Sequence, residues 1–151
     1  MTVISTRMHS LWEKIKGFDW EIIVYLILAT ILAILVRLNL LSYKSVDYET
    51  YTKIWYNAIQ TMGVSALGGD FSNYNPPYLY LLYLVARFLP GLADVVAIKI
   101  PSLIADFICA GLIYKIVRLK SENGYAALFA YCATLLSLPV ILNSSFWQPY
   151  C

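Results

Sequence analysis

The chain has 151 residues, of which 60% are hydrophobic and only 13% are charged, and its net charge is +2. Soluble domains carry about a quarter charged residues, so this composition excludes an ordinary soluble domain and places the chain among membrane proteins. The small net charge also excludes a strongly basic surface, so we expect membrane lipids and no nucleic acid as partners.

The cysteines and the single histidine do not form a metal-binding pattern. Cys109 and Cys132 lie inside apolar runs, and His9 lies in the N-terminal tail without a neighbouring ligand. Structural zinc sites need several such residues at short, regular spacing. The sequence therefore gives no support for a divalent metal or for any other bound cofactor.

Residues 22–41 form the first predicted transmembrane helix. Ile22 to Val36 carry no charge, and about 20 apolar residues cross the ~30 Å hydrocarbon layer. The apolar run is followed by Arg37 and Asn39 rather than by a small-residue cleavage site, and residues 1–21 contain three basic residues, Arg7, Lys14 and Lys16. We therefore expect a retained anchor with its N-terminal tail in the cytoplasm.

Three further apolar stretches follow, and one of them is too short to cross. Residues 78–89 stop at Pro90 and give about a dozen helical residues, or ~18 Å. Residues 95–117 and 125–142 are long enough to cross. With 118–124 as a cytoplasmic loop, a second basic cluster falls inside as the positive-inside rule requires: Lys115, Arg118 and Lys120.

The region 42–94 is then one long extracytoplasmic loop, and it contains two predicted amphipathic helices. Near 46–62, apolar side chains recur at helical spacing opposite polar ones. Near 76–89, Asn75 is a candidate N-cap and Pro76 stands at the first helical position. We expect a turn at 68–70 between these helices, and both to lie on the outer leaflet. The predicted fold is an all-α integral membrane protein with three transmembrane helices and two juxtamembrane helices.

Asp47 and Glu49 are the first candidates for chemistry, just beyond the first span. At positions i and i+2 of a helix they diverge by ~200°, so they cannot act as one carboxylate pair. One of them could serve as a catalytic group. In the alternative, both are solvated acids at a helix N-terminus, where the helix dipole favours negative charge.

Asp106 lies in the middle of a predicted span. A carboxylate inside the membrane is costly, so it indicates either a structural ion pair or a functional group. Its candidate partners are Lys99, Arg87 and Arg37. Lys99 and Arg87 could instead meet an anionic phosphate or extend toward lipid headgroups.

Taken in order, several segments resemble the N-terminal part of GT-C superfamily glycosyltransferases, the polytopic enzymes that use polyprenyl-phosphate sugars. The resemblance covers roughly residues 20–147 and is greatest to bacterial mannosyltransferase-like members. The segments that carry it are Val46-Asp47-Tyr48-Glu49, Trp55-Tyr56, Asn73-Tyr74-Asn75-Pro76-Pro77-Tyr78, Lys99 to Asp106, and Leu142-Asn143-Ser144-Ser145-Phe146-Trp147.

The resemblance implies that Asp47 is the catalytic base of a hexosyl transfer with inversion. It would take the proton of the acceptor hydroxyl as that oxygen attacks the anomeric carbon, and the polyprenyl phosphate would leave. The donor would be a polyprenyl-phosphate hexose, and the location the bacterial plasma membrane. The candidates for substrate binding are Tyr48, Glu49, Asn75, Tyr78, Arg87 and Lys99.

The end of the sequence departs from the family pattern. Family members continue with a Gly-Gln-acidic stretch and further spans, whereas here the chain reads Trp147-Gln148-Pro149-Tyr150-Cys151. We therefore expect residues 143–151 to be a truncated extracytoplasmic end and the isolated chain to be inactive. The alternatives are a nonfunctional remnant and a small membrane subunit or transporter fragment, in which Asp106 would be an intramembrane ion or proton site.

Overall fold

The structure, a computed structural model, describes residues 19–69 and 71–147, and all regular elements in these ranges are helices. The all-helical prediction is thus confirmed for the described residues. Three parts of the predicted organisation lie outside the described residues: the N-terminal tail up to residue 18, position 70 of the predicted turn, and residues 148–151. In chain order the elements are α2 (Trp20–Leu40), the π-helical η1 (Tyr48–Thr52), α3 (Lys53–Met62), the 3-10 helix η2 (Gly63–Gly68), α4 (Pro76–Phe88), α5 (Asp94–Lys120), α6 (Gly124–Leu135), α7 (Leu138–Ile141) and the π-helical η3 (Leu142–Trp147).

Two helices, α2 and α5, are long and apolar enough to cross a membrane. Their most apolar windows have mean hydropathies of 2.4 and 1.9. The 21 residues of α2 rise ~31 Å, which matches the hydrocarbon thickness. The predicted ranges 22–41 and 95–117 overlap these helices and differ from them by at most three residues at either end.

The third predicted span is not one continuous helix. The sequence predicts a single helix over 125–142, but α6 ends at Leu135, and the helical segment from Leu138 to Ser145 is bent from it by 45°. The cause is Pro139, which has no N–H to donate to the Leu135 carbonyl and whose ring would collide with it. Ser137 is extended instead, with φ −64° and ψ 135°. A third span exists only if this bent pair crosses as one unit.

Small buried residues bring α2, α5 and α6 close together, and we call these three helices the bundle. Ala33 of α2 and Ala110 of α5 have no exposed surface, and Tyr131 and Leu135 of α6 complete the same core. Small side chains permit the close approach of helices that membrane packing requires. A hydrogen bond of 2.8 Å between the hydroxyls of Thr30 and Tyr131 adds a polar link between α2 and α6.

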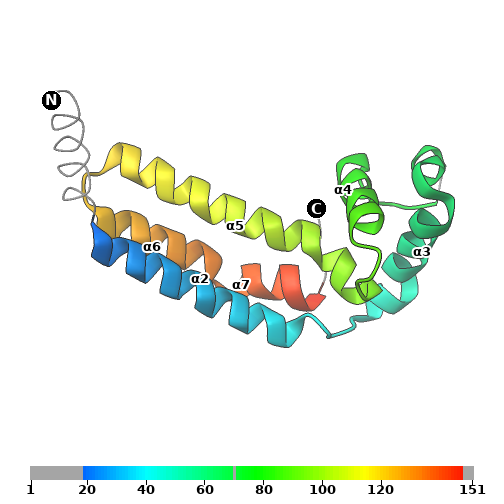
Figure 1. The fold of residues 1–151 in the computed structure, drawn as a ribbon, viewed down its shortest axis with the longest axis horizontal. Coiled ribbons are helices and arrows are strands. Elements are labelled where there is room, and N and C mark those ends of the chain that lie inside the picture. The colour runs from blue at the N-terminus through cyan, green and yellow to red at the C-terminus, as the bar shows by residue number, and fades with distance from the viewer. Residues whose placement is uncertain (1–18, 70, 148–151) are drawn as a thin grey trace, which may run out of the picture.

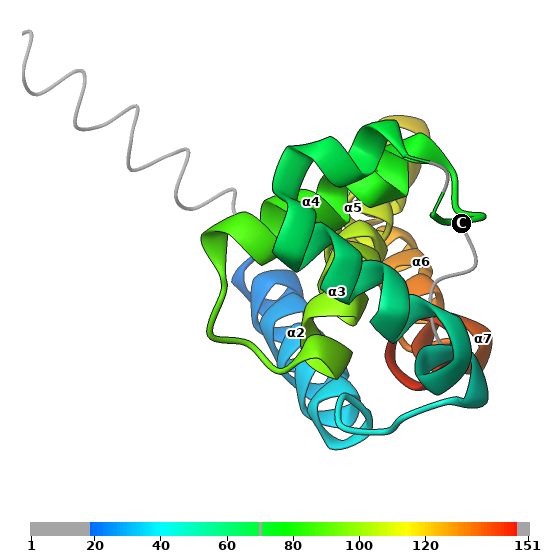
Figure 2. The same ribbon diagram turned by 90° about the vertical axis from the view of Figure 1, so that its right-hand side faces the viewer.

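The chain between the first two spans folds into a second unit, which we call the lobe and which comprises η1, α3, η2 and α4. Its core also includes the first turns of α5, and its largest fully buried hydrophobic side chains are Tyr56, Ile59, Leu82 and Ile98. The lobe lies beyond the end of α2 (Figure 1), and α3 and α4 lie across the end of the bundle when it is viewed along its long axis (Figure 2).

Local residues explain where the two lobe helices begin or end. The helix of residues 46–62 ends at Gly63, whose φ of 62° favours glycine because it has no Cβ. α4 starts at Pro76, after an extended Asn75 whose side chain makes no capping hydrogen bond, and ends one residue before the predicted 89. Its 13 residues rise ~20 Å, which is too short to cross a bilayer.

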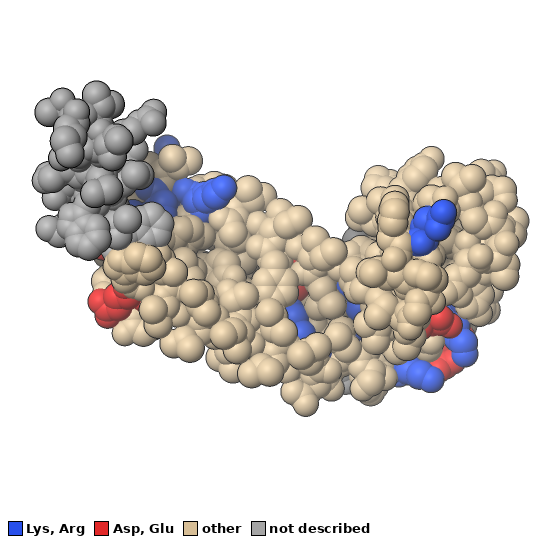
Figure 3. All heavy atoms as spheres, in the orientation of Figure 1, with Lys and Arg blue, Asp and Glu red and all other residues tan. Residues whose placement is uncertain are grey.

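On the face drawn in Figure 3, charged side chains gather at the two ends of the molecule, and the surface between them is mostly uncharged apart from a small group of basic and acidic atoms near its middle. Large apolar side chains on α2 and α5 are about half exposed, including Ile27, Leu28, Ile31, Leu35, Ile108 and Leu112. A soluble protein rarely exposes an apolar area of this extent. The surface is that of a helical membrane protein.

Candidate functional site

Asp47 lies in the first turn of the helix that opens the lobe. Ser45 caps this helix, because its hydroxyl accepts a hydrogen bond of 3.1 Å from the backbone N–H of Tyr48. The first helical bond joins the N–H of Glu49 to the carbonyl of Ser45. Asp47 is half-buried. An acid in a first helical turn is stabilised by the helix dipole, so the local fold suits both the catalytic and the structural alternative.

Glu49 lies on a different side of this helix and is held by lysines. One carboxylate oxygen lies 3.9 Å from Lys44 Nζ and the other lies 3.7 Å from Lys53 Nζ. All three side chains are about half exposed, so water screens both ion pairs and each contributes little stability. Glu49 is thus separated from Asp47, as the i, i+2 spacing predicts.

Tyr48 is buried, and so are the residues that follow it at intervals of four, Thr52 and Tyr56. Burial, then the charge of Asp94, then that of Glu49 raise the pKa of Tyr48 above its ordinary value of 10.0. Burial and then Asp94 also raise the pKa of Tyr56. Both phenols are therefore neutral at physiological pH.

These effects identify Asp94 as an acid beside the lobe core that the sequence analysis did not select. It is the first residue of α5 and lies close enough to both tyrosines to affect their ionisation. Its position after the Pro90-Gly91 turn, at the start of a predicted span, was the available clue. The lobe thus carries Asp47 and Asp94 near one buried tyrosine row.

Tyr78, a predicted substrate-binding residue, is buried and links α4 to α5. Its side chain is 3% exposed, and its hydroxyl donates a hydrogen bond of 2.9 Å to the carbonyl of Ile98. Asn75, by contrast, is exposed.

Lys99 also has a structural role. It is 1% exposed, and its ammonium donates to three carbonyls at and just after the C-terminal end of α2: Leu40 at 3.2 Å, Leu41 at 3.0 Å and Tyr43 at 2.7 Å. A cation at a helix C-terminus binds the carbonyls that have no helical partner. Lys99 joins α5 to the end of α2, whereas Arg87 lies exposed in the last turn of α4.

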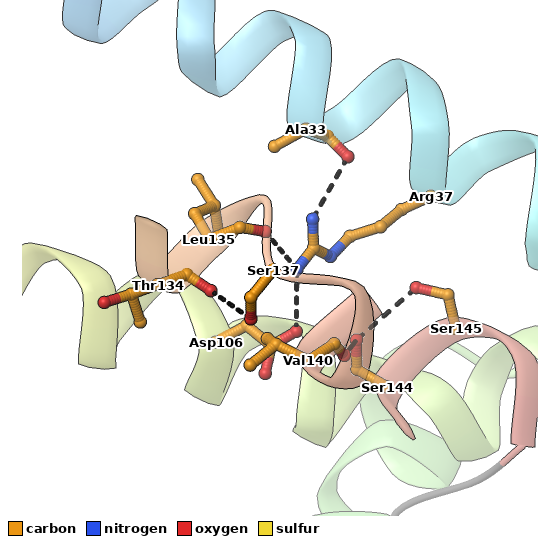
Figure 4. Close-up of polar contacts among 9 residues, drawn as sticks. All are labelled: Ala33, Arg37, Asp106, Thr134, Leu135, Ser137, Val140, Ser144 and Ser145. Carbon is orange, nitrogen blue, oxygen red and sulfur yellow. Dashed lines mark hydrogen bonds and ion pairs between the residues drawn. The ribbon is translucent and has the colours of Figure 1, made fainter. Parts of the chain in front are cut away.

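Asp106 pairs with Arg37, one of the three predicted partners. Arg37 Nη2 lies 3.0 Å from the carboxylate, and the same nitrogen donates to the Leu135 carbonyl at 2.9 Å. Figure 4 shows the guanidinium reaching from α2 to the break between α6 and α7, where it meets the carboxylate from α5. The face of the guanidinium also lies 5.5 Å from the centre of the Phe107 ring.

The helix break and the ion pair thus have one common cause. Pro139 leaves the Leu135 carbonyl without its helical donor, and Arg37 supplies that donor from another helix. Arg37 is 2% exposed and Asp106 neutralises it. Arg37 therefore links α2, α5 and α6 at the point where the third helix bends, and this arrangement indicates a structural role for Asp106.

Two other features of the described residues bear on the site. No group of three His, Cys, Asp or Glu in the described part of the chain is placed to hold a metal ion. A hollow of about 480 Å³ lies between the start of α2 and residues 122–125, at the end of the bundle opposite the lobe. It is too far from Asp47 to serve the same chemistry.

Comparisons with known proteins give no relative for this chain: no family model matches it, nor does any curated protein or solved structure.

Proposed function

We propose that this chain is the N-terminal membrane module of a glycosyltransferase that transfers a hexose from a polyprenyl-phosphate donor to an acceptor hydroxyl. The observation that carries the proposal is the folded lobe at the end of the first span, with Asp47 in the first turn of its first helix. A reaction between a lipid-linked donor and an acceptor outside the hydrocarbon needs a carboxylate held at the membrane surface by an ordered element.

The proposed topology has three spans, with the bent pair of α6 and α7–η3 as the third and the N-terminus in the cytoplasm. Both basic clusters then lie in the cytoplasm, and the lobe lies on the outer side of the proposed bacterial plasma membrane. The two amphipathic helices of the lobe would rest on the outer leaflet.

In the proposed reaction, Asp47 accepts the proton of the acceptor hydroxyl. The acceptor oxygen forms a bond to the anomeric carbon as the bond from that carbon to the phosphate oxygen breaks on the opposite face, so the configuration inverts. The electron pair of the broken bond leaves with the polyprenyl phosphate. Of the two predicted phosphate-binding cations, Arg87 is the one suited to stabilise this phosphate, because it is exposed on the lobe while Lys99 is occupied by three carbonyls.

The decisive variant is Asp47→Asn in the complete protein, inserted in membranes. Loss of a general base lowers the rate by about 100-fold or more, since general-base catalysis contributes roughly 10²–10⁴-fold. The measurement is transfer of labelled hexose from a polyprenyl-phosphate hexose. Glu49→Gln is the matched control, because it removes a nearby acid that is bound by two exposed lysines, and it is expected to retain transfer within a few-fold. Undiminished transfer by Asp47→Asn would remove Asp47 from the mechanism.

The alternative of a transporter fragment with Asp106 as its ion or proton site has less support. An intramembrane site that binds and releases a cation needs a carboxylate free to exchange partners. Asp106 is instead bound to a buried arginine that also holds the helix break. We therefore retain only the glycosyltransferase proposal.

A further inference from the structure

The lobe carries a continuous series of aromatic rings that begins one helical turn after Asp47. The ring centres of Tyr51 and Trp55 lie 5.9 Å apart, those of Trp55 and Tyr74 4.9 Å apart, and those of Tyr74 and Tyr78 4.9 Å apart. We call these four residues the aromatic strip. Such separations are those at which tilted and edge-to-face rings attract each other, so each ring helps to orient the next.

Asp47 lies in line with this strip because of the π-helical segment η1. Asp47, Tyr51 and Trp55 follow each other at intervals of four, and a π turn holds more residues than an α turn because its bonds run from i to i+5. One π turn followed by one α turn therefore keeps residues at this interval aligned. The adjacent row shows the alignment directly, since Tyr48, Thr52 and Tyr56 are 3%, 2% and 0% exposed.

The strip has an open end beside Asp47 and a fixed end on α5. Tyr51 is half exposed, Trp55 and Tyr74 are half-buried, and the hydroxyl of Tyr78 is bound to the carbonyl of Ile98. A surface whose rings are already ordered loses little conformational entropy when it binds a ligand. The strip is thus a preformed platform that leads toward the proposed base.

We propose that the aromatic strip binds a saccharide portion of the acceptor and directs its free hydroxyl to Asp47. This inference rests on the proposed function and names its acceptor class. The negative face of an aromatic ring attracts the electropositive C–H groups on the flat side of a sugar ring, while the hydroxyls at the edge of the sugar need polar partners. The rings of the strip meet the first need, and the Asp47 carboxylate, which lies in the same row as Tyr51 and Trp55, meets the second at one hydroxyl of the sugar.

The test is saturation-transfer NMR of mannotriose with the full protein in detergent. Replacing one stacking ring by alanine costs roughly a factor of five or more in affinity, by analogy with bases that stack on aromatic side chains. We expect this loss for Trp55→Ala and Tyr51→Ala, and a smaller loss for Trp55→Phe, which keeps a ring. Trp20→Ala is the control, because Trp20 is 60% exposed at the opposite end of the bundle.

Three results would overturn the inference. In the first, the wild-type protein transfers no saturation to mannotriose, and in the second, Trp55→Ala and wild type bind mannotriose with equal affinity. In the third, Trp55→Ala weakens the interaction with phosphatidylglycerol vesicles but not the binding of mannotriose. The last result would make the strip a lipid contact. A circular dichroism spectrum equal to that of wild type shows that each variant is folded.

The saccharide-binding proposal for the strip and the catalytic proposal for Asp47 can be refuted independently of each other. Asp47→Asn keeps a hydrogen-bonding side chain, so it should bind mannotriose with an affinity close to that of wild type while transfer is lost. Trp55→Ala should raise KM for a saccharide acceptor much more than it lowers kcat. If Asp47→Asn retains transfer and Trp55→Ala still weakens mannotriose binding, the catalytic role of Asp47 is wrong but the strip is a saccharide site.

Discussion

Arg37 shows how one residue can decide the arrangement of three helices. Its guanidinium binds the Asp106 carboxylate from α5, the Leu135 carbonyl at the end of α6 and, at 3.4 Å, the Ala33 carbonyl of its own helix. An ion pair between buried groups is favourable only when further hydrogen bonds satisfy both partners, and here the proline-induced break supplies one of them.

We predict that Arg37→Met strongly destabilises the bundle. It leaves Asp106, whose side chain is 17% exposed, without its counter-ion, and removal of one partner of a buried pair costs about 3 kcal/mol or more. The measurement is unfolding in mixed micelles with increasing SDS. The double variant Arg37→Met/Asp106→Leu removes both charges and should recover a large part of the loss. No recovery in the double variant would show that Arg37 acts mainly through the Leu135 carbonyl.

At the scale of the element, irregular helices carry most of the specific geometry. The π-helical η1 brings Asp47 into line with Tyr51 and Trp55, which a regular α-helix would rotate progressively away from each other. The break after α6 leaves the Leu135 carbonyl without a helical donor, and this carbonyl accepts a hydrogen bond from Arg37. The η1 segment contains Glu49 and follows Asp47, whereas the break after α6 has no charged residue of its own and is met by Arg37 from α2. Neither irregularity follows from hydrophobic periodicity.

The start of α6 is packed closely against α2 at position 124, where an added side chain would meet the end of the Ile22 side chain. A Cβ there would overlap Ile22 Cδ1, whereas a Cβ at Gly111 of α5 would meet nothing within 4 Å. We predict that Gly124→Leu lowers the free energy of unfolding by about 1–3 kcal/mol, the usual cost of overpacking, and that Gly111→Leu leaves it nearly unchanged. SDS-induced unfolding measures both.

The matched rescue for Gly124→Leu is Ile22→Ala, which removes the overlapping carbon. The double variant should be more stable than Gly124→Leu alone. Additive losses from the two substitutions would mean that the helices do not meet at this point.

At the scale of the whole molecule, the main question is whether the bent pair crosses the membrane. Asn143 and Glu122 lie near its two ends and are both exposed. In the proposed topology they lie on opposite sides, and Asn73 of the lobe lies on the same side as Asn143. A re-entrant pair would put Asn143 and Glu122 on the same side.

We predict that single cysteines at Asn73 and Asn143 react with a membrane-impermeant maleimide on intact cells, and that one at Glu122 reacts only after the cells are opened. The background is the chain with its three cysteines, Cys109, Cys132 and Cys151, replaced by serine. Labelling of Glu122→Cys from the outside would refute the proposed topology, and protection of Asn143→Cys would refute the third span alone.

The sequence by itself determined the helical class, the two long spans and the positions of the lobe helices. Apolar length, the 3.6-residue period, Gly63 and Pro76 are local properties, and helix bounds depend mainly on such properties. It also predicted the position of Asp47 in the first helix of the lobe. The sequence analysis predicted one continuous helix over 125–142 from its apolar length and did not use Pro139, which is the local signal for the break.

Only the tertiary structure decided which residues meet. Arg37 rather than Lys99 or Arg87 pairs with Asp106, 69 residues away, and Lys99 instead binds the carbonyls after α2. Tyr78 joins the lobe to α5, and Tyr74 brings a loop residue onto Trp55. Local patterns cannot predict such pairs, because the partner of a charge or of an aromatic ring depends on how whole helices pack, and that packing is set by the shape of the entire core.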